Sequence, residues 1–146
     1  MNFENSQSLM KAIESVLLID DDKINNYINE RLIKQTGFSQ NIIVKTNGEE
    51  GINYLENECI PQNKTPTLIL LDINMPVING IEFIEIFNKL CFPSLNTIKI
   101  CILSTSENES DLQKIKQLGS FYFVSKPLTK QKLQDIYQNN FEKSEI

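Results

Sequence analysis

Acidic side chains follow two short apolar segments of the sequence. The run Asp20–Asp22 comes after the apolar residues 16–19, and Asp72 comes after the apolar residues 68–71. Carboxylate oxygens suit a hard divalent cation, and Mg²⁺ accepts one or two carboxylates while keeping water or phosphate oxygens at its other positions. A carboxylate can also act as a nucleophile toward phosphorus and form an aspartyl phosphate. These residue types therefore favour metal-assisted phosphoryl transfer.

Further polar groups follow the later apolar runs. Ser104 and Thr105 come after residues 98–103, and Lys126 comes shortly after the more aromatic residues 121–124. A lysine and a hydroxyl group beside a carboxylate can hold a phosphoryl group, because this reaction needs mainly positioning and charge stabilisation. The set is sufficient for phosphoryl transfer without histidine.

The sequence contains no histidine. This absence excludes Ser/His/Asp and Cys/His catalytic systems, imidazole metal ligands and a self-phosphorylating histidine. The 146 residues include 14 Lys and Arg against 19 Asp and Glu, which gives a formal charge of −5. Nucleic acid is therefore not expected as a direct partner. The length favours a single domain, since domains average about 150 residues.

The cysteines indicate a reducing compartment. Cys59, Cys91 and Cys101 show no C-x-x-C spacing, and three cysteines cannot all pair within one chain. Residues 1–15 lack the uninterrupted apolar core of a signal peptide, and no run approaches the length of a membrane span. The expected location is the cytoplasm, without a membrane partner.

The apolar pattern predicts the elements that must position the polar groups. Five short runs are typical of strands buried on both faces of a parallel sheet, at residues 16–19, 42–44, 68–71, 98–103 and 121–124. Stretches with helical spacing alternate with them, the first of which has Ile24, Tyr27, Ile28 and Leu32 before a helix stop at Gly37. The alternation predicts a three-layer α/β sandwich.

Other boundaries are expected from single residues. Asp22 and Thr129 suit the N-cap positions of the first and last helices. The segment 57–67, with its two prolines, is expected to be a loop. Residues 1–14 precede the first strand, and we expect them to form an N-terminal extension, either a short loose helix or a flexible tail, before a domain at residues 15–146.

The strands of a parallel sheet end on one edge, and ligands bind outside those carboxyl ends. We therefore expect the polar groups after the strands to share one site. Carboxylates gathered at one edge repel each other unless a cation lies among them, which predicts a Mg²⁺ site. Plainer interpretations stay open for single residues: Asp20–Asp22 suits a helix-capping turn, Ser104–Ser106 suits a helix start, and Lys126 suits a surface lysine.

Four segments in order resemble the receiver domain of two-component response regulators. They are VLLIDDD at 16–22, LILLDINMP at 68–76 followed by Asn79-Gly80, CILSTS at 101–106 and FVSKP at 123–127. Each segment alone is modest, but the ordered set is specific. The resemblance runs from about Val16 to the C-terminal helix. It implies the CheY-like, flavodoxin-like (βα)5 fold, a doubly wound parallel sheet with strand order 2-1-3-4-5.

The resemblance implies a phosphoacceptor and a metal site. Asp72 would accept the phosphoryl group. Asp20, Asp21 and Asp72 would bind Mg²⁺ together with the backbone carbonyl of Asn74, and Mn²⁺ would be able to substitute for Mg²⁺. Asn74 would also influence dephosphorylation.

The resemblance also implies roles for residues after the last two strands. Ser104 would hydrogen-bond the phosphoryl group and Lys126 would pair with its charge. Phe123 would be an aromatic switch that turns inward when Ser104 moves, although a phenylalanine at a strand end is first a core residue. Lys126-Pro127 resembles the cis peptide of the family. Thr105 and Ser106 would tune access and dephosphorylation.

These roles imply a signalling phosphoacceptor and not an enzyme with turnover beyond self-phosphorylation from a donor and slow autodephosphorylation. The chain has no histidine of its own, so the donor would be another protein, a sensor histidine kinase or a histidine phosphotransfer protein, or else a small acyl or amino phosphate. The output would be contact with a downstream protein effector through a changed surface, by a monomer or a phosphorylation-dependent dimer.

Two alternatives belong to other functional classes. A Mg²⁺-dependent phosphohydrolase of the haloacid-dehalogenase type also uses an aspartate nucleophile after a strand, but it has a second aspartate two residues later, where this chain has Asn74. A receiver-like binding module that is never phosphorylated is the other alternative. Against it, every expected acidic, hydroxyl and lysine position is filled.

Overall fold

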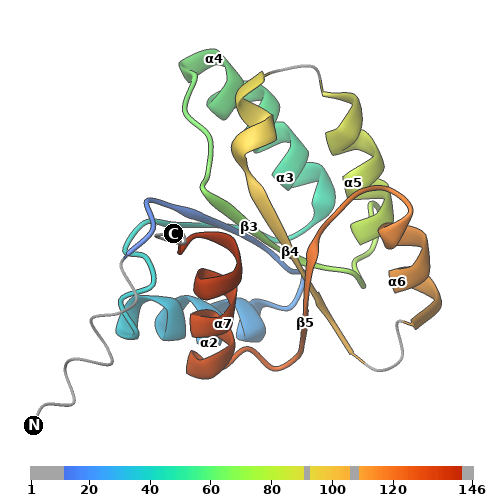
Figure 1. The fold of residues 1–146 in the computed structure, drawn as a ribbon. Helices are drawn as coiled ribbons and strands as arrows, with labels where there is room; N and C mark the ends of the chain where they lie inside the picture. The colour runs from blue at the N-terminus through green and yellow to red at the C-terminus, as the bar shows by residue number, and fades with distance from the viewer. Residues whose placement is uncertain (1–11, 91–92, 106–108, 143–146) are drawn as a thin grey trace, which may run out of the picture.

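Five parallel strands form one sheet in the order β2-β1-β3-β4-β5 (Figure 1). The computed structural model describes residues 12–90, 93–105 and 109–142. The strands are β1 Val16–Ile19, β2 Ile42–Lys45, β3 Leu68–Asp72, β4 Lys99–Ser104 and β5 Tyr122–Ser125. The predicted strand order is therefore confirmed.

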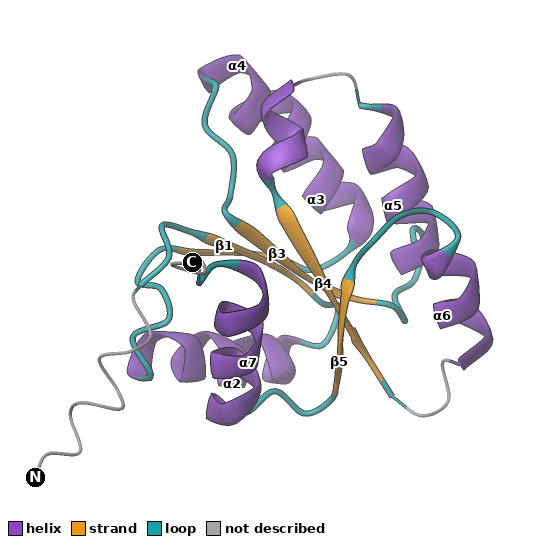
Figure 2. Ribbon diagram, viewed as in Figure 1, coloured by secondary structure: helices purple, strands orange, loops and turns teal. Residues whose placement is uncertain are grey.

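Helices cover both faces of the sheet, with α2 and α7 on one face and α3, α5 and α6 on the other (Figure 2). The α-helices are α2 Lys23–Gln35, α3 Gly48–Tyr54, α4 Ile60–Gln62, α5 Gly80–Lys89, α6 Glu109–Lys116 and α7 Lys130–Asn140; a π-helix η1 spans Leu55–Cys59 and a 3-10 helix η2 spans Pro93–Thr97. This arrangement is the predicted three-layer α/β sandwich.

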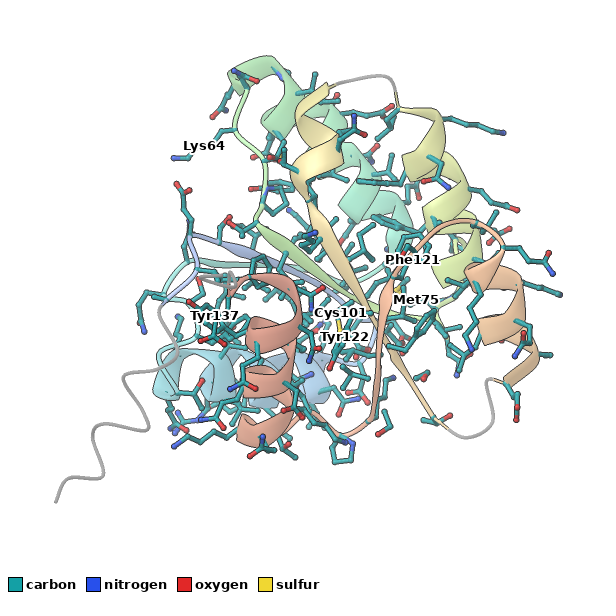
Figure 3. All side chains as sticks on the ribbon, viewed as in Figure 1. Lys64, Met75, Cys101, Phe121, Tyr122 and Tyr137 are labelled. Carbon is teal, nitrogen blue, oxygen red and sulfur yellow. The ribbon has the colours of Figure 1, made fainter. Side chains whose placement is uncertain are left out.

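The central strands are apolar along their whole length because both of their faces are buried. In β1, Leu17 and Ile19 join the core under α3 and α5, whereas Val16 and Leu18 join the core under α2 and α7. The same division places Cys101 and Tyr137 in the second core and Met75 and Phe121 in the first (Figure 3). The edge strands are less buried: β2 is half-buried along its length and β5 buries only Val124 of its four residues. The prediction of burial on both faces therefore fails for both edge strands.

Helix α2 exposes most of the apolar side chains that mark it in the sequence. Ile24, Tyr27 and Ile28 are 70%, 61% and 54% exposed, whereas Asn26 and Ile33 are buried. The amide of Asn26 explains this orientation, because its Nδ2 donates a hydrogen bond of 2.7 Å to the backbone carbonyl of Asp20. The hydrogen bond from Asn26 to the residue after β1 therefore decides which side of the first turns of α2 is buried. The stripe of Ile24, Tyr27 and Ile28 does not.

The segment 57–67 begins as a helix, which corrects the prediction of a loop. The π-helix η1 and the turn α4 carry the helical path on to Gln62, where Asn63 in the left-handed conformation ends it. Pro61 lies on this path. A proline removes one helical N–H and clashes with the carbonyl four residues earlier, and a wider π turn is one way in which a helix accommodates such a disturbance.

The orientation of α2 predicts different costs for two isoleucines on the same helix. Ile33→Ala should lower the free energy of unfolding by about 2–5 kcal/mol, because it leaves a cavity at a fully buried position. Ile28→Ala should change it by no more than about 0.5 kcal/mol, because that side chain is more than half exposed. Urea unfolding of both variants measures the difference; equal losses would contradict the orientation of the helix.

Candidate phosphoacceptor and metal site

The ends of four strands bring the polar groups together. Asp72 is the last residue of β3 and Ser104 is the last residue of β4. Asp20 directly follows β1, and Lys126 directly follows β5. In the sheet register Asp72 lies opposite Leu103, and Ser104 lies opposite Ser125. The carboxyl edge thus gathers the residues that the sequence singled out.

Asp72 is a buried carboxylate paired with a lysine. The residue is 2% exposed, and Lys126 Nζ donates to Asp72 Oδ1 in an ion pair. Burial raises the pKa of the Asp72 carboxyl, while the hydrogen bond and charge of Lys126 oppose that rise and the charge of Asp21 adds to it. A buried carboxylate without such a partner would be costly, so Lys126 stabilises the ionised form that a nucleophile needs.

Asp20 is held by the backbone around it. Its Oδ1 accepts the N–H of Asp22 at 2.9 Å, and its own N–H donates to the carbonyl of Lys45 at 3.2 Å. Burial raises the pKa of Asp20 to about 6; the Asp22 N–H opposes this rise, and the negative charge of Asp72 adds to it. Asp20 Oδ2 is buried and has no hydrogen-bond partner within the described part of the chain.

Three carboxylates form a cluster that fits a cation. One oxygen from each of Asp20, Asp21 and Asp72 lies within 4.8 Å of the other two. Asp21 is exposed whereas the other two are buried, so the cluster has an open side. An all-oxygen donor set of this kind suits a hard divalent ion, and Asp20 Oδ2, which has no hydrogen-bond partner among the described residues, offers a ligand atom. The residues present therefore fit a Mg²⁺-type ion.

Asp22 belongs to the helix and not to the cluster. Its carboxylate accepts the backbone N–H groups of Ile24 and Asn25 at 2.9 and 3.2 Å, which makes it the N-cap of α2 as predicted. Thr129 caps α7 in the same way by accepting the N–H of Lys132.

The start of α5 holds the loop that follows Asp72 in place. Asn79 and Glu82 form a capping box at the start of α5. Gly80 approaches this loop so closely that an added Cβ would lie 2.8 Å from the Cα of Ile73, which explains the glycine after Asn79. Asn74 is exposed, and its backbone N–H bonds to the Asp72 carboxylate.

The remaining site residues lie on or after β4 and β5. Ser104 is 6% exposed, and its carbonyl accepts the backbone N–H of Lys126 at 2.8 Å. Thr105 is exposed, and Ser106 lies outside the described residues. The Lys126–Pro127 peptide bond is cis.

Phe123 lies half-buried at the edge of the sheet. Its ring packs against the core under α3 and α5, and Lys116 Nζ of α6 lies 5.6 Å from the ring centroid. A cation over an aromatic face is attracted by the ring quadrupole. The aromatic ring therefore links β5 to α6.

Two residues that contact the site segments were not predicted. Asn26 holds the carbonyl of Asp20, and Lys132 Nζ donates to the carbonyls of Ser125 and Pro127, which flank Lys126. Both are polar residues on helices without a motif. Only an i to i+6 spacing connects them to the residues they serve, Asp20 with Asn26 and Lys126 with Lys132, and that spacing has no specific meaning in a sequence.

Comparison with known proteins identifies the family of this fold and site. Residues 16–138 match the model of the response regulator receiver domain. Two-component response regulator 24 of Arabidopsis thaliana is 29% identical over 133 residues, which cover 91% of this chain and 88% of that protein. The crystal structure of a two component response regulator from Cytophaga hutchinsonii is 39% identical, with a TM-score of 0.76 over 88% of this chain and 97% of that one.

The chain belongs to the response regulator receiver domain family. It is thus a receiver of two-component signalling, a family of phosphoacceptors that work with phosphodonor partners and typically use Mg²⁺. Chemotaxis protein CheY4 of Vibrio cholerae has the same fold, with 23% identity and a TM-score of 0.69 over 89% of this chain and 100% of that one. Among the described residues, no helix combines the length and apolar character needed to cross a membrane.

The carboxylate cluster predicts that Mg²⁺ stabilises the protein. Mg²⁺ should raise the Tm of the wild type, because it binds the folded cluster and relieves the repulsion among its charges. Asp21→Asn should reduce this rise, since it removes one ligand oxygen and one charge at the open side of the cluster. Glu49→Gln, at an exposed acid in the first turn of α3, is the matched control and should retain the full rise. Thermal unfolding with and without Mg²⁺ measures each shift; equal shifts in both variants would contradict the assignment.

Proposed function

We propose that this receiver accepts a phosphoryl group on Asp72 from a histidine kinase or a histidine phosphotransfer protein, with Mg²⁺ bound by Asp20, Asp21, Asp72 and the backbone carbonyl of Asn74. The observation that carries the proposal is the buried Asp72 carboxylate, which pairs with Lys126 and lies within 4.8 Å of two further carboxylates. Membership of the receiver family supports it over a phosphohydrolase with turnover and over an unphosphorylated binding module.

In this reaction one oxygen of the Asp72 carboxylate attacks the phosphorus of a phosphohistidine. A P–O bond forms to Asp72 while the P–N bond breaks, and its electron pair leaves with the donor imidazole, which takes up a proton from solvent. The product is an acyl phosphate that carries about −1.5 to −2 of charge. Bound Mg²⁺ would supply positive charge beside the phosphoryl oxygens.

The residues of this chain then hold the added group. Lys126 shifts its interaction from the carboxylate toward the phosphoryl charge, and the Ser104 hydroxyl donates a hydrogen bond to a phosphoryl oxygen. Charge-assisted hydrogen bonds of this kind are roughly twice as strong as neutral ones. Asn74, Thr105 and Ser106 control the approach of water and donor, so they tune the slow loss of the phosphoryl group.

The output is a change in the surface made by α6, β5 and α7. Phe123 is its switch, because its ring is half-buried beneath Lys116 and lies on the strand that leads to Lys126. Movement of Ser104 toward the phosphoryl group opens room for the ring to turn inward. A downstream protein then contacts the changed surface, as a partner of the monomer or of a phosphorylation-dependent dimer. The proposed location is the cytoplasm.

The proposed domain comprises residues 15–146, with residues 1–14 as an extension before it; residues 1–11 of that extension lie outside the described residues. Ile13 of that extension packs against the domain, because its side chain is buried beside α2 and α7 and its N–H donates to the carbonyl of Phe38 at 2.8 Å.

Phosphorylation on Asp72 predicts a specific change in mass. Wild-type protein incubated with Mg²⁺ and acetyl phosphate should gain one phosphoryl group, and Asp72→Asn should gain none, because the amide is not a nucleophile for this reaction. Asp135→Asn, at an aspartate of α7 outside the cluster, is the matched control and should gain the group like the wild type. Mass spectrometry of the intact proteins provides the readout. A gain that survives Asp72→Asn would reject the assignment.

The aromatic switch predicts an optical signal, because the chain contains no tryptophan. Phe123→Trp introduces a single tryptophan, whose emission, excited apart from that of the four tyrosines, should shift when Mg²⁺ and acetyl phosphate are added together. Phe121→Trp, two residues earlier and farther from the site, is the matched control and should shift much less. In an Asp72→Asn background neither emission should move. An equal shift at both positions, or one that persists without Asp72, would contradict the switch.

A further inference from the structure

Lys132 of α7 binds the loop that carries Lys126. Its Nζ donates to the carbonyl of Ser125 at 2.7 Å, to the carbonyl of Pro127 at 2.9 Å and to the hydroxyl of Ser125 at 3.2 Å. A lysine ammonium has three N–H donors, and all three bond to Ser125, the last residue of β5, or to Pro127. Two of the acceptors are the backbone carbonyls on either side of Lys126.

The bonds of Lys132 hold the backbone of Lys126 at the edge of the sheet. Within the described part of the chain, β5 lies at the edge of the sheet and pairs with β4 alone (Figure 1). The backbone N–H of Lys126 donates to the backbone carbonyl of Ser104, the last residue of β4, at 2.8 Å. No second strand of the described chain pairs with β5, and Lys132 bonds to the carbonyls on either side of Lys126. The backbone of Lys126 is therefore held between β4 and α7 while its side chain reaches Asp72.

We propose that Lys132 is a positioning residue, which fixes the backbone of Lys126 so that the Lys126 ammonium meets Asp72 and, later, its phosphoryl group. This inference rests on the proposed phosphorylation of Asp72. The bonds of Lys132 end on Ser125, the last residue of β5, and on Pro127, which flank Lys126, so Lys132 acts through Lys126. A displacement of a catalytic group by about 1 Å can cost on the order of a hundredfold in rate, which sets the scale of the effect.

The chain offers matched variants for a test. Lys132→Met removes the three donors and keeps a long, unbranched side chain. Lys132→Arg keeps the charge and several donors. Lys130→Met removes the same charge from the same helix, at an exposed side chain that makes no hydrogen bond or ion pair with the described residues. A Lys126→Met variant, alone and combined with Lys132→Met, completes a double-mutant cycle.

Two measurements are made on these proteins: the rate of phosphoryl uptake from acetyl phosphate with Mg²⁺, and the free energy of unfolding in urea. Lys132→Met should lower the uptake rate about tenfold or more, Lys132→Arg should recover part of it, and Lys130→Met should match the wild type. In the Lys126→Met background, Lys132→Met should have little further effect on the rate. The effects of the two substitutions on unfolding should likewise be non-additive.

The outcomes separate the two proposals. If the wild type takes up no phosphoryl group while the unfolding effects of the two lysines are non-additive, the proposed function fails, and of the positioning role only the placement of the Lys126 ammonium against Asp72 stands. If the wild type is phosphorylated but Lys132→Met reacts at its rate, the positioning role is wrong. Effects of Lys132→Met that are the same with and without Lys126 would show a merely structural contact and would also overturn the inference.

Discussion

The ion pair between Lys126 and Asp72 is the interaction on which the site depends. Asp72 ends a strand that is buried on both faces, so its carboxylate lies where an unpaired charge is costly. Lys126 follows the edge strand β5, two strands away from β3 in the sheet, and reaches Asp72 from there. Burial raises the pKa of Asp72 and Lys126 opposes that rise. The pair thus favours the ionised form of a buried carboxylate.

The rest of the structure either brings these two residues together or compensates for their charges. The parallel sheet aligns the ends of β1, β3, β4 and β5 on one edge. Asp20 and Asp21 add negative charge beside Asp72, and this excess favours a divalent cation and, with it, an anionic phosphoryl group. Asn26 and Lys132 hold the backbones of Asp20 and of the Lys126 loop. The three carboxylates repel each other when no cation is bound, and the same carboxylates therefore favour the binding of one.

Much of this arrangement could be predicted from the sequence, because position after an apolar strand is a local signal. Asp20, Asp72, Ser104 and Lys126 each follow or end such a run, and parallel strands end on one edge. The buried side of α2 could not be predicted, since the hydrogen bond from Asn26 to Asp20 outweighs the apolar stripe of Ile24, Tyr27 and Ile28. The helical path through Pro61 was missed because proline usually indicates the end of a helix, whereas η1 widens to accommodate it.

Chemical trapping of the acyl phosphate tests the central claim most directly. Borohydride reduces an aspartyl phosphate to homoserine, and trypsin cleavage after Lys64 and Lys89 releases the peptide 65–89, in which Asp72 is the single aspartate. After reaction with acetyl phosphate and Mg²⁺, tandem mass spectrometry of the reduced protein should find homoserine at residue 72. Homoserine at another aspartate, with residue 72 unchanged, would contradict the account.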